Sequence, residues 1–145
     1  MTLHPITDLT ELKRHLNAAL QLEHATIPPY LTALYSLRPG SNSEAAQILR
    51  TVAVEEMLHL TLVANVLNAV GGSVDLTRPG FVPRYPAYLP DGEEDFQVDL
   101  RRFSPEAIET FLKIERPASL AHGEIRTVTR PRGSTLLAAR AHPES

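Results

Sequence analysis

The sequence contains no cysteine. Disulfides, thiolate nucleophiles and cysteine-based metal sites are therefore excluded, and any bound metal must be held by histidine and carboxylate side chains. No apolar run is long enough to cross a bilayer, and the N-terminal residues lack the pattern of a signal peptide. The net charge of −3 and the pI near 6.1 do not suggest a surface for nucleic acid or membrane. We therefore expect a cytoplasmic protein without nucleic-acid or membrane partners.

The 145 residues fit one domain, and two segments of the chain show apolar residues at helical spacing. The first runs from Leu9 to Tyr35, with Thr7 or Asp8 as the N-cap. Two adjacent prolines lie inside it at 28–29, and they predict a bend because proline cannot donate a backbone hydrogen bond. The second segment follows the capping-box spacing of Ser41 and Glu44 and ends at the glycine pair 71–72. Together they predict an antiparallel helical hairpin.

The rest of the chain contains less regular structure. Residues 73–102 contain many prolines and are predicted to form a loop, with a short strand at Phe96–Leu100. A third, short helix is expected from Ser104, its N-cap, to Pro117. Its inner face is expected to contain Ile108, Phe111, Leu112 and Glu115. We thus predict an all-α domain over residues 1–117, followed by an irregular or disordered tail over residues 118–145.

Three polar residues interrupt the apolar stripes of the hairpin: Glu23 in the first, and Glu56 with His59 in the second. A buried carboxylate must be paired, protonated or bound to metal. Glu56 and His59 are three positions apart and share a helix face. A Glu-x-x-His pair beside a Glu on a neighbouring helix is half of a di-iron carboxylate site in a helical bundle. The pattern therefore predicts metal ligands at these three positions, for iron or manganese.

The competing interpretation is a surface contact, because a lone Glu-x-x-His pair occurs often by chance. Two neighbours of the predicted ligands are assigned to other roles. Glu55 lies one position off the stripe and is expected to be solvated or to support the ligands from outside. His24 is expected to be a hydrogen-bonding neighbour of Glu23.

Two runs carry a resemblance to a known family. They are residues 23–36, EHATIPPYLTALYS, and residues 54–72, VEEMLHLTLVANVLNAVGG. Both resemble the ferritin-like domain of iminophenyl-pyruvate dimer synthases, and the loop at 79–90 and the segment 111–117 are also similar to it. The family includes the enzyme of violacein and related bisindole pathways, which oxidatively couples two imines derived from indole-3-pyruvate. The resemblance covers roughly residues 8–117. It implies a four-helix ferritin-like bundle, metal-dependent oxidation, and ligand roles for Glu23, Glu56 and His59.

The chain departs from that family after Pro117, where no second Glu-x-x-His follows. The family's pattern is therefore C-terminally truncated here, and Glu124 resembles its third carboxylate ligand. Three hypotheses remain open. The chain is a metal-dependent oxidoreductase acting on amino-acid-derived imines, a homodimer that binds iron without substrate chemistry, or an inactive truncated remnant. In a homodimer each copy would give Glu23, Glu56 and His59, and the complete set of four Glu and two His would result.

Overall fold

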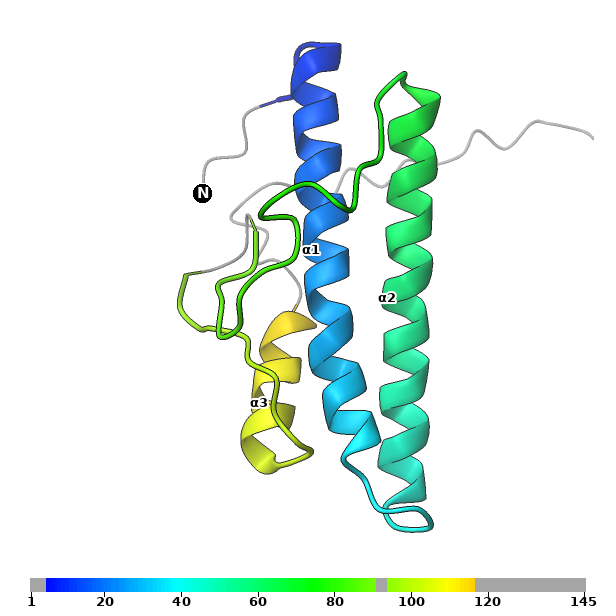
Figure 1. Cartoon of the computed structure of the whole chain (residues 1–145), viewed down its shortest axis with the longest axis vertical. Coiled ribbons are helices and arrows are strands. Elements are labelled where there is room, and N and C mark those ends of the chain that lie inside the picture. Colours follow the sequence, from blue (N-terminus) through cyan, green and yellow to red (C-terminus); the bar gives the residue numbers. More distant parts are fainter. Residues whose placement is uncertain (1–4, 91–93, 117–145) are drawn as a thin grey trace, which may run out of the picture.

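The computed structural model describes residues 5–90 and 94–116 and contains three helices there. They are α1 (Leu9–Tyr35), α2 (Ser43–Ala69) and α3 (Pro105–Ile114). In Figure 1, α1 and α2 run side by side as a hairpin, and α3 lies along α1 on the side away from α2. The prediction of an all-α hairpin with a short third helix is confirmed. The tail predicted at 118–145 lies outside the described residues.

The α1 helix is continuous through both prolines. Its N-cap is Asp8, whose side chain accepts a hydrogen bond from the backbone N–H of Glu11 at 2.8 Å. Because Pro29 has no N–H, the carbonyl of Ala25 loses its usual helical donor. The hydroxyl of Tyr85, from the loop after α2, donates to this carbonyl at 2.7 Å. A loop residue thus satisfies the acceptor that the proline leaves free.

The start of α2 differs from the prediction. Its N-cap is Asn42, in the left-handed conformation with φ of 49°, and the side chain makes no capping hydrogen bond. The hydroxyl of Ser41 donates to the carbonyl of Arg38 at 2.8 Å, so the predicted capping box does not form. The other end agrees with the sequence, because Gly71 follows the helix with φ of +73°, where glycine is favoured.

The loop contains less strand than predicted. Within the described residues, the segment expected as a strand makes only an isolated antiparallel bridge between Ala87 and Val98. Ser104 caps α3 as predicted and accepts from the N–H of Ala107 at 3.3 Å. The inner face of α3 is formed by Ala107 and Phe111, whereas Leu112 is 68% exposed, so its predicted inward position is wrong.

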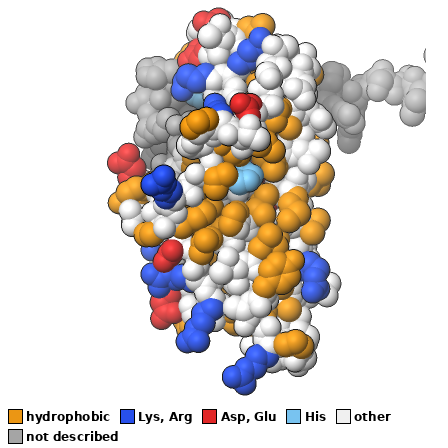
Figure 2. All heavy atoms as spheres, in the orientation of Figure 1, with side chains coloured by type: hydrophobic (Ala, Val, Ile, Leu, Met, Phe, Trp, Pro, Cys, Tyr) orange, Lys and Arg blue, Asp and Glu red, His pale blue; other side chains and the backbone are white. Residues whose placement is uncertain are grey.

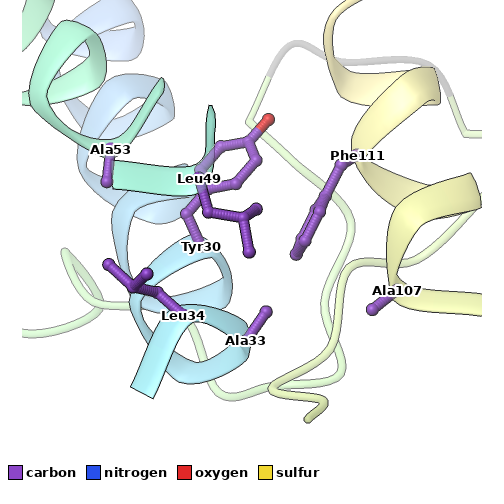
Figure 3. Packing of buried hydrophobic residues seen from close by; sticks show 7 residues of the cluster. All are labelled: Tyr30, Ala33, Leu34, Leu49, Ala53, Ala107 and Phe111. Carbon is purple, nitrogen blue, oxygen red and sulfur yellow. The ribbon is translucent and has the colours of Figure 1, made fainter. Parts of the chain in front are cut away.

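Two hydrophobic clusters hold the elements together. The larger one joins all three helices, and Figure 3 shows its members facing one another: Tyr30, Ala33, Leu34, Leu49, Ala53, Ala107 and Phe111. The smaller one joins Leu20 of α1, Leu67 of α2 and Phe81 of the loop. The predicted metal ligands occupy the helical turns between these clusters. The fold therefore places a polar layer between two apolar ones.

None of the helices formed by the described residues is long and apolar enough to span a membrane.

Candidate metal centre

The three predicted ligands meet between α1 and α2. His59 Nδ1 lies 3.5 Å from Glu23 Oε2 and 3.7 Å from Glu56 Oε1. One ligand atom from each residue lies within 4.8 Å of the other two. The helical hairpin thus brings together residues that are more than 30 positions apart, in the pairing that the two apolar stripes predict.

The three side chains differ in their exposure to solvent. Glu56 is buried, Glu23 is partly buried, and the side chain of His59 is 51% exposed. Their positions within the apolar stripes predict burial, which is correct for Glu56 and wrong for His59. His59 lies at the edge of the contact between the helices, so the cluster is closed on the α1 side and open beside the histidine.

Thr26 connects the two carboxylate-bearing helices. It is buried, and its hydroxyl donates to the carboxylate of Glu56 and also contacts the backbone carbonyl of Glu23 at 2.8 Å. A hydroxyl has a single proton, so it donates to only one of these oxygens at a time. The contact fixes the position of the Glu56 carboxylate within the hairpin.

The surroundings oppose ionisation of both glutamates. Burial raises the pKa of Glu23, the negative charge of Glu56 raises it further, and His59 acts in the opposite direction. Burial also raises the pKa of Glu56, against the hydrogen bond from Thr26, which lowers it. Two carboxyl groups in one partly buried site repel each other when both are charged. A bound cation would remove this cost, because metal ions displace protons from their ligands.

A third carboxylate, that of Glu115 at the C-cap of α3, approaches the site. Glu115 Oε1 accepts a hydrogen bond of 2.6 Å from the hydroxyl of Tyr30. The charge of Glu115 contributes to the raised pKa values of Glu23 and Glu56. The sequence pattern did not identify this pair as part of the site. Its partners are 85 positions apart, and only the contact between α1 and α3 brings them together.

The donor set fits a divalent cation. Ligand atoms about 2.1 Å from a tetrahedral metal are about 3.4 Å apart. The separations of 3.5 and 3.7 Å are close to that value. Two carboxylates and one imidazole, without sulfur, suit iron or manganese. Without a metal, the same residues could form an ion pair if His59 were protonated.

Neither neighbouring candidate joins the cluster. His24 packs edge-on against the ring of Phe81, with the ring centroids 5.1 Å apart. Its buried Nδ1 has no hydrogen-bond partner among the described residues, so the expected hydrogen-bonding role is not seen for this atom. Glu55 is exposed, as predicted.

Comparison with known proteins gives one family match. A family model described as Ferritin-like matches residues 16–142, a segment that contains all three ligands of the cluster. No curated protein and no solved structure matches the chain.

Proposed function

This chain belongs to the ferritin-like family, and from that premise we propose that it binds iron or manganese through Glu23, Glu56 and His59 and uses the metal in oxidative chemistry. The observation that carries the proposal is the convergence of these three side chains within one polar layer. Two ionised carboxylates in this partly buried layer would destabilise the fold unless a bound cation offsets their charge.

Each residue has a distinct role in this proposal. Glu23 and Glu56 offer negative oxygens that offset the charge of a divalent cation, and His59 offers a neutral nitrogen through Nδ1. Thr26 holds the Glu56 carboxylate in place. Tyr30 and Glu115 form a hydrogen-bonded pair beside the cluster that can hold a proton. A bound iron or manganese ion would supply one-electron oxidation and reduction.

The reaction class that we propose is oxidative coupling of amino-acid-derived imines. It is supported by the resemblance of residues 23–36 and 54–72 to iminophenyl-pyruvate dimer synthases. Such a coupling forms one carbon–carbon bond between two imine molecules and removes two electrons and two protons. Dioxygen would accept them to give hydrogen peroxide, or hydrogen peroxide would accept them to give two molecules of water.

Metal content tests the binding step. Protein purified after iron or manganese loading is analysed for metal, together with the variants Glu56→Gln and Glu109→Gln. Glu109 is an exposed glutamate of α3 outside the cluster, so it controls for the loss of one charge. We expect the wild type and Glu109→Gln to retain metal equally, and Glu56→Gln to lose at least 10-fold in affinity. Equal metal content in all three proteins would refute the proposed site.

The reaction class needs a separate assay. Metal-loaded protein is mixed with the imine of indole-3-pyruvate in the presence of dioxygen or peroxide, and coupled product is measured by mass spectrometry. We expect product with the wild type and none with Glu56→Gln. A protein that holds metal but gives no product would leave the metal site standing and rule out this substrate.

Metal binding without substrate chemistry is the second candidate function. The structure has a surface hollow of about 480 Å³ over α3, and a smaller one of about 240 Å³ between α1 and α2. Neither hollow is lined by Glu23, Glu56 or His59. A substrate in either of these two hollows would not contact the cluster, and this observation motivates metal binding without substrate chemistry as the second candidate.

A further inference from the structure

A second apolar pattern runs along α2 at the edge of its contact with α1. Seven residues recur at alternating spacings of four and three, and we call them the α2 seam: Ile48, Val52, Glu55, His59, Leu62, Val66 and Ala69. This spacing is the heptad repeat of helices that pack along their whole length against another helix. The two polar members, Glu55 and His59, are adjacent at its centre.

Most of the seam has no cover within the described residues. Ile48 is 56% exposed, Leu62 51% and Val66 47%. Figure 2 shows one face of the molecule, on which hydrophobic side chains surround a histidine while charged groups lie toward the edges. A helix that is apolar on several sides is normally buried on several sides. An apolar seam that leads to a half-exposed ligand therefore indicates an interface at the metal centre.

The seam is complementary to itself in the antiparallel direction. If two copies of α2 cross about a two-fold axis at the level of Met57, Ile48 lies opposite the partner's Val66, and Val52 lies opposite the partner's Leu62. The central layer then places Glu55 of each copy opposite the partner's His59. Four of the five apolar positions pair with one another, Ala69 lies opposite the partner's Ala45, and the polar pair meets its complement. A single polar layer in an apolar seam specifies register.

We propose that a second copy of this chain occupies the α2 seam in this antiparallel register, so that two half-sites form one metal centre. This inference rests on the proposed metal binding at Glu23, Glu56 and His59. Glu56 and His59 lie one and two residues from the axis level, or within about 3 Å along the helix. The two Glu-x-x-His pairs would therefore come together and provide four glutamates and two histidines, the donor set of a two-metal carboxylate bundle.

The partner's Glu55 has a defined role in this arrangement. Nδ1 is the ring nitrogen of His59 that faces Glu23 and Glu56. The other nitrogen, Nε2, lies on the opposite edge of a half-exposed ring. Histidine ligands of metals usually donate this second N–H to a carboxylate or carbonyl, which fixes the ring and its tautomer. The opposing Glu55 is suited to accept it, so each copy would position the ligand of the other.

The size of the seam predicts how the dimer depends on metal. A helix of 27 residues is about 40 Å long and about 10 Å wide, which gives roughly 400 Å² per copy. Stable interfaces cover about 800 Å² per partner, so the seam alone is small. A metal bound by residues of both copies would favour the dimer by mass action. We expect association to strengthen when metal is added.

The mass of the protein in solution tests whether a second copy binds the α2 seam. Light scattering is performed with and without added Mn²⁺ on the wild type, Leu62→Lys and Leu112→Lys. Leu62 is in the seam, whereas Leu112 is more exposed and lies on α3, so Leu112→Lys controls for a lysine in place of an exposed leucine. We expect the wild type and Leu112→Lys to be dimers with Mn²⁺ bound at two ions per dimer. Leu62→Lys should dissociate at least 10-fold more readily, with unchanged helical circular dichroism.

Disulfide trapping tests the register, and the absence of native cysteine makes it direct. Equal amounts of Ile48→Cys and Val66→Cys are mixed with Mn²⁺ and oxidised. The mixed disulfide should form, because these positions are opposite in the proposed register. Neither variant alone should crosslink efficiently, because its two cysteines would be 18 residues, or about 27 Å, apart along the helix. Crosslinking of Ile48→Cys with itself would overturn the register.

The two proposals fail in different ways. A monomer that binds Mn²⁺ would overturn the shared centre and leave the proposed metal site standing. A dimer that crosslinks in the proposed register but binds no metal would overturn the proposed function, and with it the shared centre. A monomer whose seam cysteines resist a thiol reagent would assign the seam to another part of the same chain and overturn the second copy.

Discussion

The two long helices have equal length but different surroundings. Each has 27 residues, yet α1 buries seven of them and α2 buries four. The large exposed apolar residues of α1 are at its ends, Leu9 and Tyr35. Those of α2 are distributed along most of its length: Ile48, Val54, Met57, Leu58, Leu62 and Val66. The loop and α3 cover α1, whereas α2 packs mainly against α1. Similar amphipathic sequences can therefore specify a central helix and a helix at an open face.

The largest loss of stability is expected for a substitution at the contact between α1 and α2. Leu67 is fully buried on α2, where it contacts Leu20 and Phe81. Leu67→Ala removes buried apolar surface and leaves a cavity, and we expect it to lower the free energy of unfolding by about 3 kcal/mol. Urea unfolding followed by circular dichroism measures this. A loss below about 1 kcal/mol would mean that the hairpin contact is looser than the structure shows.

A smaller loss of stability is expected where the loop after α2 packs on α1. Tyr85→Phe removes the donor to the Ala25 carbonyl, which then lies in a buried segment without its partner. Burial raises the pKa of Tyr85 to about 12, so the hydroxyl is protonated at neutral pH and able to donate. We expect a loss of about 2 kcal/mol in the free energy of unfolding. Tyr88→Phe, at an exposed loop position, is the matched control and should change it by less than about 0.5 kcal/mol.

The smallest effect is expected on the outer side of α2, away from the seam. Val54 is 56% exposed and is not one of the seven seam residues. Val54→Ala should change the free energy of unfolding by less than about 0.5 kcal/mol. Unfolding in urea at two protein concentrations measures this and separates folding from association. A loss comparable to that of Leu67→Ala would show that this side of α2 is also covered, and the contrast between the helices would disappear.

The positions of the helices could be predicted from the sequence better than the packing of their residues. Apolar spacing and caps located all three helices, because the caps at Asp8 and Ser104 are local hydrogen bonds. The capping box at Ser41 did not form, because its hydroxyl bonds to the preceding turn. Leu112 shows that spacing alone does not predict burial, because an apolar residue at the right spacing still needs a neighbouring element to cover it.

The same distinction applies to the site. Glu23, Glu56 and His59 could be predicted because each interrupts a periodic stripe. Helical spacing puts Glu56 and His59 on one face, and the packing of the two stripes in the hairpin brings Glu23 to their level. The pair of Tyr30 and Glu115 could not, because it depends on how α3 docks against α1. The exposure of His59 was also missed, since periodicity does not show where the edge of a helix contact lies.

The hydrogen bond from Tyr85 to Ala25 links the proline-containing turn of α1 to the loop. The loop cannot move away from the hairpin without exposing that carbonyl, and the turn cannot rearrange without displacing the loop. Glu23 lies two residues before Ala25 and Thr26 directly after it. The positions of a predicted ligand and of the hydroxyl that supports Glu56 therefore depend on a residue about 60 positions later in the chain. The loop and this turn should therefore open as one cooperative unit, with similar opening free energies in native-state hydrogen exchange.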